Sequence, residues 1–218
     1  MKSFIIIKSV AIVVMMLFSA IAMSQNNSMK DAVEAAQKGK QDLLEILRSG
    51  RDLNIGVSAD ELERARAGTP VPRKMLNFDQ MLNMKPDSDL SKMVKEAGSK
   101  SVIVPFGKNM DVATIVVVAP SEKGYEVAGL GGTSVAQDLS RVMKASGSSN
   151  IVAYEVPNLQ TTIYAVTESG QGMYYTSFQG NSIRRGVSAS ALFPALQQAA
   201  QKFQQEYGDK VKDQRLVR

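Results

Sequence analysis

The amino-acid sequence predicts an α+β fold, in which a mostly antiparallel sheet carries packed helices in the order βββ-α-βββ(β)-α behind an N-terminal helical segment. Three observations predict it: short apolar or alternating runs are separated by tight-turn residues, two longer stretches repeat apolar residues at helical spacing, and 44% of the 218 residues are hydrophobic, as in globular proteins. The predicted organisation is a signal peptide (1–24), a helical and Pro-rich segment (25–100), a sheet domain (101–208) and a charged tail (209–218).

The first residues have the pattern of an export signal. The lysines Lys2 and Lys8 precede the uninterrupted apolar run Val10–Phe18, and small residues follow it. This run is too short to span a bilayer, so we expect cleavage before Gln25 or before Met23, with an uncleaved anchor as the alternative. Because the chain has no cysteine and hence no disulfide framework, a bacterial periplasm or the medium is the expected location.

The segment after the signal opens with two predicted helices. Apolar residues fall on one face of Met29–Arg48, although Gly39 costs that helix about 1 kcal/mol relative to alanine. Ser58 and Glu61 form the S-x-x-E capping box of a second, short helix.

The rest of this segment is predicted to be extended, with one further short helix. The prolines in Thr69–Pro72 cannot continue a helix. A third helix is expected over Ser88–Ala97. The run Asp87-Ser88-Asp89 lacks the glycine and glutamate of a calcium loop, so it is interpreted as a helix N-cap, and no metal site is predicted.

From residue 101 onward, strands and helices follow one another closely. The run Val112–Val118 is apolar on both faces, which predicts a central, covered strand. The predicted strands are Val102–Phe106, Val112–Val118, Tyr125–Leu130, Ile151–Val156, Thr161–Thr167, Met173–Phe178 and, as an optional last strand, Ser182–Val187; the predicted helices are Ser134–Ala145 and Ala191–Tyr207, the latter closed by Gly208.

The stretch Val112–Val166 resembles a pattern found in poorly characterised secreted bacterial α+β proteins. The residues that carry it are TIVVVAPSEKGYEVAGLGG, then VAQDLSRVMKA, then IVAYEVPNLQTTIYAV, and ADELERARAGTPVP is similar to exported proteins of this kind. The resemblance covers about half of the mature chain. It implies a fold and an exported location, and no activity of particular residues.

The composition excludes several catalytic machineries. Without histidine or cysteine there is no Ser-His-Asp triad, no cysteine nucleophile and no thiolate or histidine-ligated metal. The chain has neither an S-x-x-K nor a G-x-S-x-G motif. No cofactor is predicted, and a catalytic role is not favoured.

Two binding sites are candidates. Gly131, Gly132, Thr133 and Ser134 lie at a predicted helix N-terminus, where backbone amides can hold an anion; a tight turn with an N-cap at Thr133 or Ser134 is the alternative. The second candidate is a contact surface on the last strands, formed by Tyr174, Tyr175, Phe178, Arg184 and Arg185. Its alternative is a sheet with helices on both faces and every tyrosine buried.

These observations predict an exported, noncatalytic binding protein whose partner is a protein or an envelope component. A protease-inhibitor or propeptide-like module, with Gly68–Met75 as a protruding loop, is the alternative, and a hydrolase using carboxylates or Ser/Lys is a weaker one. Signal removal lowers the net charge from +5 to +3, so no nucleic-acid partner is expected; no later segment is long enough to span a membrane. Three basic pairs are interpreted as solvated surface: Arg64/Arg66, Arg73/Lys74 and Arg184/Arg185.

Overall fold

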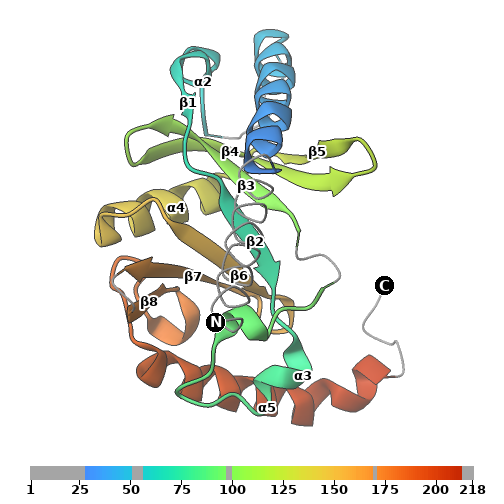
Figure 1. Cartoon of the computed structure of the whole chain (residues 1–218), viewed down its shortest axis with the longest axis vertical. Helices are drawn as coiled ribbons and strands as arrows, with labels where there is room; N and C mark the ends of the chain where they lie inside the picture. The colour runs from blue at the N-terminus through green and yellow to red at the C-terminus, as the bar shows by residue number, and fades with distance from the viewer. Residues whose placement is uncertain (1–27, 51–55, 97–99, 169–170, 213–218) are drawn as a thin grey trace, which may run out of the picture.

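The computed structural model describes residues 28–50, 56–96, 100–168 and 171–212, and it has the predicted α+β architecture. Residues 28–48 are helical and are called the N-terminal helix below. An eight-stranded, mostly antiparallel sheet follows, and two longer helices, α4 (Thr133–Ser146) and α5 (Ala189–Lys212), pack on it (Figure 1). The predicted signal peptide lies outside the described residues.

The sheet consists of two antiparallel halves that share a central strand. Its strands are β1 (Arg66–Ala67), β2 (Val71–Met75), β3 (Val102–Lys108), β4 (Asp111–Ser121), β5 (Gly124–Leu130), β6 (Ile151–Val156), β7 (Thr161–Glu168) and β8 (Gln171–Tyr175). Their order is β5-β4-β3-β2-β6-β7-β8, and β1 pairs with β3. The β2–β6 pair is parallel, and the other pairs between described strands are antiparallel.

The central strand β2 forms from the stretch that the sequence predicts only to be extended. Val71 and Pro72 pair with β3, and Arg73 to Met75 pair with β6. Because the pairing with β6 begins after Pro72, the missing N–H of the proline does not interrupt that ladder. The sequence Gly68–Met75 is therefore not a protruding loop, since most of it lies inside the sheet.

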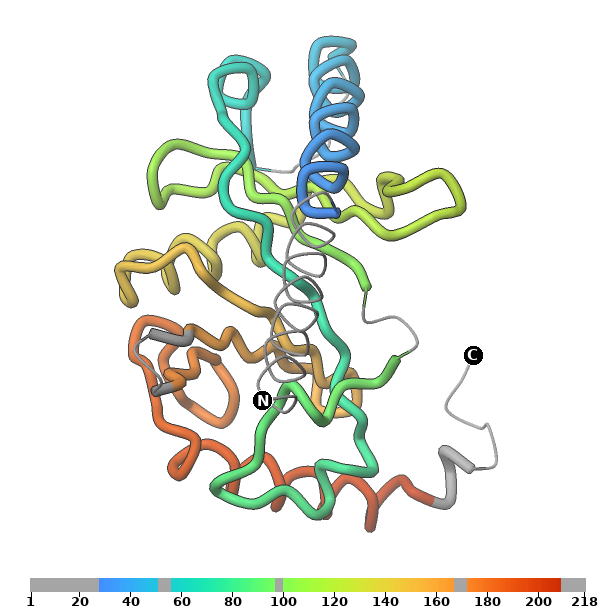
Figure 2. The backbone as a smooth tube through the Cα atoms, in the orientation of Figure 1, coloured from blue at the N-terminus to red at the C-terminus, as the bar shows by residue number. Residues whose placement is uncertain are grey.

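Helices cover both faces of the sheet. α4 packs against residues from both halves, among them Ile103, Ile115 and Tyr164. The N-terminal helix covers the opposite face of β3 and β4, and α5 covers the opposite face of β6 and β7. The N-terminal helix and α5 lie at opposite ends of the molecule, with β2 running between them (Figure 2).

Of the two short helices predicted from the sequence, one is confirmed and the other is wrong. The capping box is confirmed, because Ser58 Oγ accepts from the Glu61 N–H and a Glu61 carboxylate oxygen accepts from the Ser58 N–H. The helix predicted over Ser88–Ala97 is wrong: the chain there forms one 3-10 turn, Leu90–Lys92, and then extends to bridge back to the end of β2. A short helix that the sequence did not indicate, α3 (Phe78–Met81), precedes it.

The end of the chain differs from the prediction in two ways. The optional strand Ser182–Val187 does not form, because Ile183 turns into the core under α4 and only Val187 bridges to Tyr174. The helix α5 does not stop at Gly208, which is buried within it beside the side chain of Gln204. The first four residues of the predicted tail are thus helical, and the others lie outside the described residues.

Gly39 lets the N-terminal helix approach the sheet closely. A Cβ atom at this position would lie 2.9 Å from Val127 Cγ2 and 3.0 Å from Val116 Cγ1. Ala36 and Ala32, one and two turns earlier, are fully buried in the same core. Close packing therefore offsets the helix-propensity cost of the glycine.

Lys40 joins the N-terminal helix to α2 (Ala59–Arg64). Its ammonium donates to the carbonyls of Glu63 at 3.1 Å and Ala65 at 2.7 Å, and it lies 5.7 Å from the ring centre of Phe106. The residue is 7% exposed, and this burial lowers its pKa, against an opposing effect of the Glu63 carboxylate. The ammonium therefore satisfies carbonyls that the end of α2 leaves without helical partners.

Replacing Lys40 by methionine tests this connection. Lys40→Met keeps most of the side-chain volume but removes the donor from two carbonyls, so we expect the free energy of unfolding to fall by roughly 1–3 kcal/mol in urea denaturation. Lys38→Met changes an exposed lysine of the same helix and should leave it within about 0.5 kcal/mol of the parent. Equal stability of the two variants would contradict this role of Lys40.

Candidate functional site

The aromatic residues of the last strands lie in the core. Tyr175 is 5% exposed and packs under α4. Tyr174 and the half-buried Phe178 pack on the opposite face, where the rings of Tyr174 and Phe193 of α5 have centroids 5.0 Å apart. Because β8 has a helix on each face, neither set of its alternating side chains forms an aromatic surface. Helices on both faces, as in the alternative, are the arrangement observed, although Tyr174 is half-buried and not fully buried.

The basic residues that the sequence analysis singled out are dispersed. Arg184 and Arg185 are exposed. Arg73 donates to a Glu155 carboxylate oxygen at 2.6 Å across the β2–β6 pair, so its charge is used within the sheet. Arg64 and Arg66 lie elsewhere, beside a pocket described below, and the three pairs do not form one stripe.

The glycines before α4 serve the turn itself. Gly132 is the N-cap, with φ 119°, and no side chain caps the helix, so the N-cap predicted at Thr133 or Ser134 is wrong. A Cβ atom on Gly132 would lie 3.1 Å from Ile115 Cδ1, and the Gly131 N–H donates to the Ile115 carbonyl. Backbone conformation and close approach to β4 thus explain both glycines, and anion binding here stays a prediction.

Acidic residues do not gather into a metal site in the part of the chain that the structure describes: no three His, Cys, Asp or Glu side chains there are arranged to hold an ion. Asp89 instead accepts from the N–H of Ser91 and caps the 3-10 turn, which confirms its interpretation as an N-cap. Hydrogen bonds from Ser91 also lower the Asp89 pKa.

A half-open pocket of about 590 Å³ lies where β1 and the β3–β4 hairpin meet the end of α4. We call it the basic pocket, because Arg64, Arg66 and Lys108 line it. Its apolar wall includes Pro105, Val112 and Met143. The volume is in the range of small-molecule sites, and the mixture of cations with an apolar wall suits a ligand that carries an anionic group.

Backbone pairing places the cations of this pocket. β1 pairs with the end of β3, so that Arg66 lies opposite Gly107. The register shifts at Gly107, and a Cβ atom there would meet the Asp111 carbonyl oxygen at 1.8 Å, so only glycine fits this bulge. The bulge and the left-handed Asn109, with φ 57°, shape the hairpin that carries Lys108.

A hydrogen bond between two hydroxyl groups connects further segments that line the pocket. Thr69 Oγ1 donates to Ser149 Oγ at 3.1 Å and thereby links the chain before β2 to the loop after α4. The Gly68 N–H donates to the Pro105 carbonyl at 2.8 Å. These contacts tie the segment before β2 to the loop after α4 and to β3, and all four residues line the pocket.

The pocket carries an excess of positive charge. None of its three cations takes part in an ion pair among the described residues. Its one carboxylate, Asp111, pairs with Lys144 of α4. An anion entering the pocket therefore meets cations whose charge no carboxylate in direct contact neutralises.

Sequence reasoning missed this pocket. Arg64 and Arg66 were interpreted as solvated surface, and Lys108 belongs to no motif that the sequence analysis singled out. The pocket combines residues from β1, the segment before β2, the β3–β4 hairpin, α4 and the loop after it. Only tertiary structure brings these segments together, so no local motif could have indicated the site.

Comparison with protein-family models, curated proteins and solved structures gives no match to this chain. The resemblance to secreted bacterial α+β proteins therefore stays a prediction. Among the described helices, none combines the length and the apolar character needed to cross a membrane.

Alkaline titration tests the burial of the tyrosines. Desolvation is the largest of the effects that raise the pKa of Tyr154 to about 12, and it also raises those of Tyr164 and Tyr174. In the unfolded chain these phenols ionise at about pH 10. The unfolded state therefore loses their protons first, and the free energy of unfolding should fall as the pH rises from about 10 towards 12.

We expect the tyrosinate absorbance of the folded protein to rise in more than one step, with the later steps well above the single step seen in denaturant. A folded protein whose tyrosines all ionise together near about pH 10 would contradict their placement in the core.

Proposed function

We propose that this chain is an exported, noncatalytic binding protein and that the basic pocket holds an anionic group of its partner. The observation that carries the proposal is the convergence of Arg64, Arg66 and Lys108 on one pocket, where the single lining carboxylate, Asp111, is paired with Lys144. Arginine presents a planar fork of donors that matches carboxylate and phosphate groups. This proposal moves the contact surface from the buried tyrosines to the basic pocket.

Catalysis is less well supported by the same residues. The pocket offers no histidine or cysteine, and its carboxylate is an ion-pair partner rather than one of two acids facing each other. Glu155, which the sequence placed on a strand, is paired with Arg73. The inhibitor-like alternative loses its main support, because most of Gly68–Met75 belongs to the sheet.

The export part of the proposal predicts a processed protein. Intact mass of the protein recovered from the periplasm or the medium should correspond to a chain that begins at Gln25 or, as the second choice, at Met23. A mature species that still contains Lys2 would contradict the signal peptide.

Binding of small anions tests the basic pocket. We expect citrate and pyrophosphate to bind the exported protein weakly but saturably in calorimetry at low salt. Arg66→Glu combined with Lys108→Glu should weaken binding at least roughly tenfold, since two attractive charges become repulsive. The matched control, Lys85→Glu with Lys123→Glu, makes the same charge change at exposed lysines outside the pocket.

Binding that falls equally in both double variants would show a response to net charge alone and would contradict a site at the pocket. Thermal unfolding of each variant checks that a loss of binding is not a loss of fold.

A further inference from the structure

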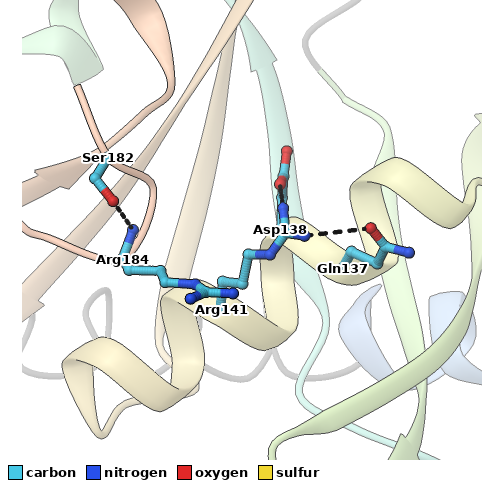
Figure 3. Close-up of polar contacts among 5 residues, drawn as sticks. All are labelled: Gln137, Asp138, Arg141, Ser182 and Arg184. Carbon is cyan, nitrogen blue, oxygen red and sulfur yellow. Dashed lines mark hydrogen bonds and ion pairs between the residues drawn. The ribbon is translucent and has the colours of Figure 1, made fainter. Parts of the chain in front are cut away.

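A second basic hollow lies along the same helix. It has a volume of about 400 Å³ and is lined by Ser140, Arg141, Lys144, Ala145 and Arg184. Arg184 comes from the loop after β8, where its N–H donates to Ser182 Oγ at 3.3 Å, and its side chain is directed toward α4 (Figure 3). No ion pair among the described residues involves Arg184.

The neighbouring cation Arg141 is already held in place. Its guanidinium donates to Asp138 at 3.2 Å and to Gln137 at 3.4 Å, and in Figure 3 it turns toward these residues on its own helix. Asp138 is half-buried, and burial raises its pKa against the opposing effect of Arg141. Arg141 is thus positioned by partners on α4, while Arg184 contributes a charge with no carboxylate beside it.

Two contacts join this hollow to the basic pocket. Lys144 lines the hollow, and its ion-pair partner Asp111 lines the basic pocket. Ser140 also lines the hollow, and its Oγ accepts from the N–H of Val112 at 2.7 Å, a residue of the pocket wall. The two depressions therefore adjoin along one seam between α4 and the start of β4.

Together they form one strongly cationic surface. Six cations belong to it, Arg64, Arg66, Lys108, Arg141, Lys144 and Arg184, against the carboxylates of Asp111, of Asp138 and of Glu61, which interacts with Arg64. The excess of three positive charges equals the net charge of +3 expected after signal removal. Such a concentration attracts polyanions over distances comparable with the Debye length.

We propose that the basic pocket and the second hollow together bind a linear acidic polysaccharide. Repeated carboxylates along a flexible chain can contact the cations of both depressions, whereas one small anion can occupy only one depression. The aromatic side chains on which single-stranded nucleic acids stack are missing from the residues that line either depression. This inference rests on the proposed function, because the basic pocket is the first of the two subsites.

The length of the ligand provides the test. We would measure binding of galacturonate oligomers to the exported protein, with a neutral galactose oligomer as the uncharged control. A trimer should bind the basic pocket alone, and a dodecamer should bind roughly tenfold tighter because it adds the second hollow. The gain should disappear as salt is raised.

Substitutions separate the two subsites. Arg184→Ala, alone or with Arg141→Ala, should weaken the dodecamer several-fold and leave the trimer unchanged; the single variant breaks no ion pair among the described residues, so its fold should be intact. Arg66→Glu combined with Lys108→Glu should weaken the binding of both the trimer and the dodecamer. Lys85→Ala with Lys123→Ala, outside both depressions, serves as the control.

Other outcomes overturn the inference in distinguishable ways. If the trimer binds as tightly as the dodecamer and Arg184→Ala has no effect, the proposal of a polysaccharide that spans both depressions is wrong. The proposed function, binding of an anionic group in the basic pocket, would be unaffected. If the exported protein binds neither citrate, nor pyrophosphate, nor any of the oligomers, the proposed function is wrong as well. Tighter binding of single-stranded DNA with the same number of charges, or of anionic phospholipid vesicles, would show that the ligand class is wrong.

Discussion

The three-residue parallel ladder between β2 and β6 makes this molecule one sheet instead of two. Pairing of Arg73 with Ala153, Lys74 with Tyr154 and Met75 with Glu155 is the direct strand contact between the halves. The Arg73–Glu155 ion pair spans the same ladder. Because the two halves then share a continuous face, α4 can pack on both of them.

The position of α4 depends on this continuity and in turn determines where charge collects. One side of the helix is buried, with Leu139, Val142 and Met143 in the core. Its other residues stand between the β3–β4 hairpin and the loop that carries Arg184. A helix that packed on one half alone could not bring cations from both halves of the sheet to the same surface.

The cations of this protein serve two different purposes. Lys40 and Arg73 are held by carbonyls or a carboxylate inside the structure, where they fix one element to another. Arg66, Lys108 and Arg184 form no ion pair among the described residues and line the two depressions beside α4. Sequence alone does not separate these classes, because both consist of ordinary basic residues next to apolar runs.

Local patterns predicted most of the fold. The strand Ile151–Val156 and the helix at Ser134–Ala145 are found within a residue of their expected bounds, because alternation, helical spacing and flanking turn residues agree there. β2 was predicted only as extended, since its partners are defined by long-range pairing. The tyrosines were ambiguous for a related reason: an aromatic on either face of a strand is equally consistent with core and with surface.

The candidate site could not be predicted in the same way. Its residues are contributed by segments that are distant in the chain, and none of them forms a recognisable motif. What the sequence did indicate was narrower: Arg184 as an exposed charge, and a composition without histidine and cysteine that turns attention from catalysis to binding.

The β2–β6 ladder also has a consequence for how the chain acquires its structure. Arg73 and Glu155 are 82 residues apart in sequence, so the ladder can form only after most of the polypeptide is present. Contacts of such long range slow the search for the native state. Until β6 is available for pairing, the edge of β2 in the N-terminal half has unpaired backbone groups. Late pairing of this kind would lengthen the time for which that strand edge can pair with another copy of the chain, so aggregation during folding should be most pronounced before β6 has paired.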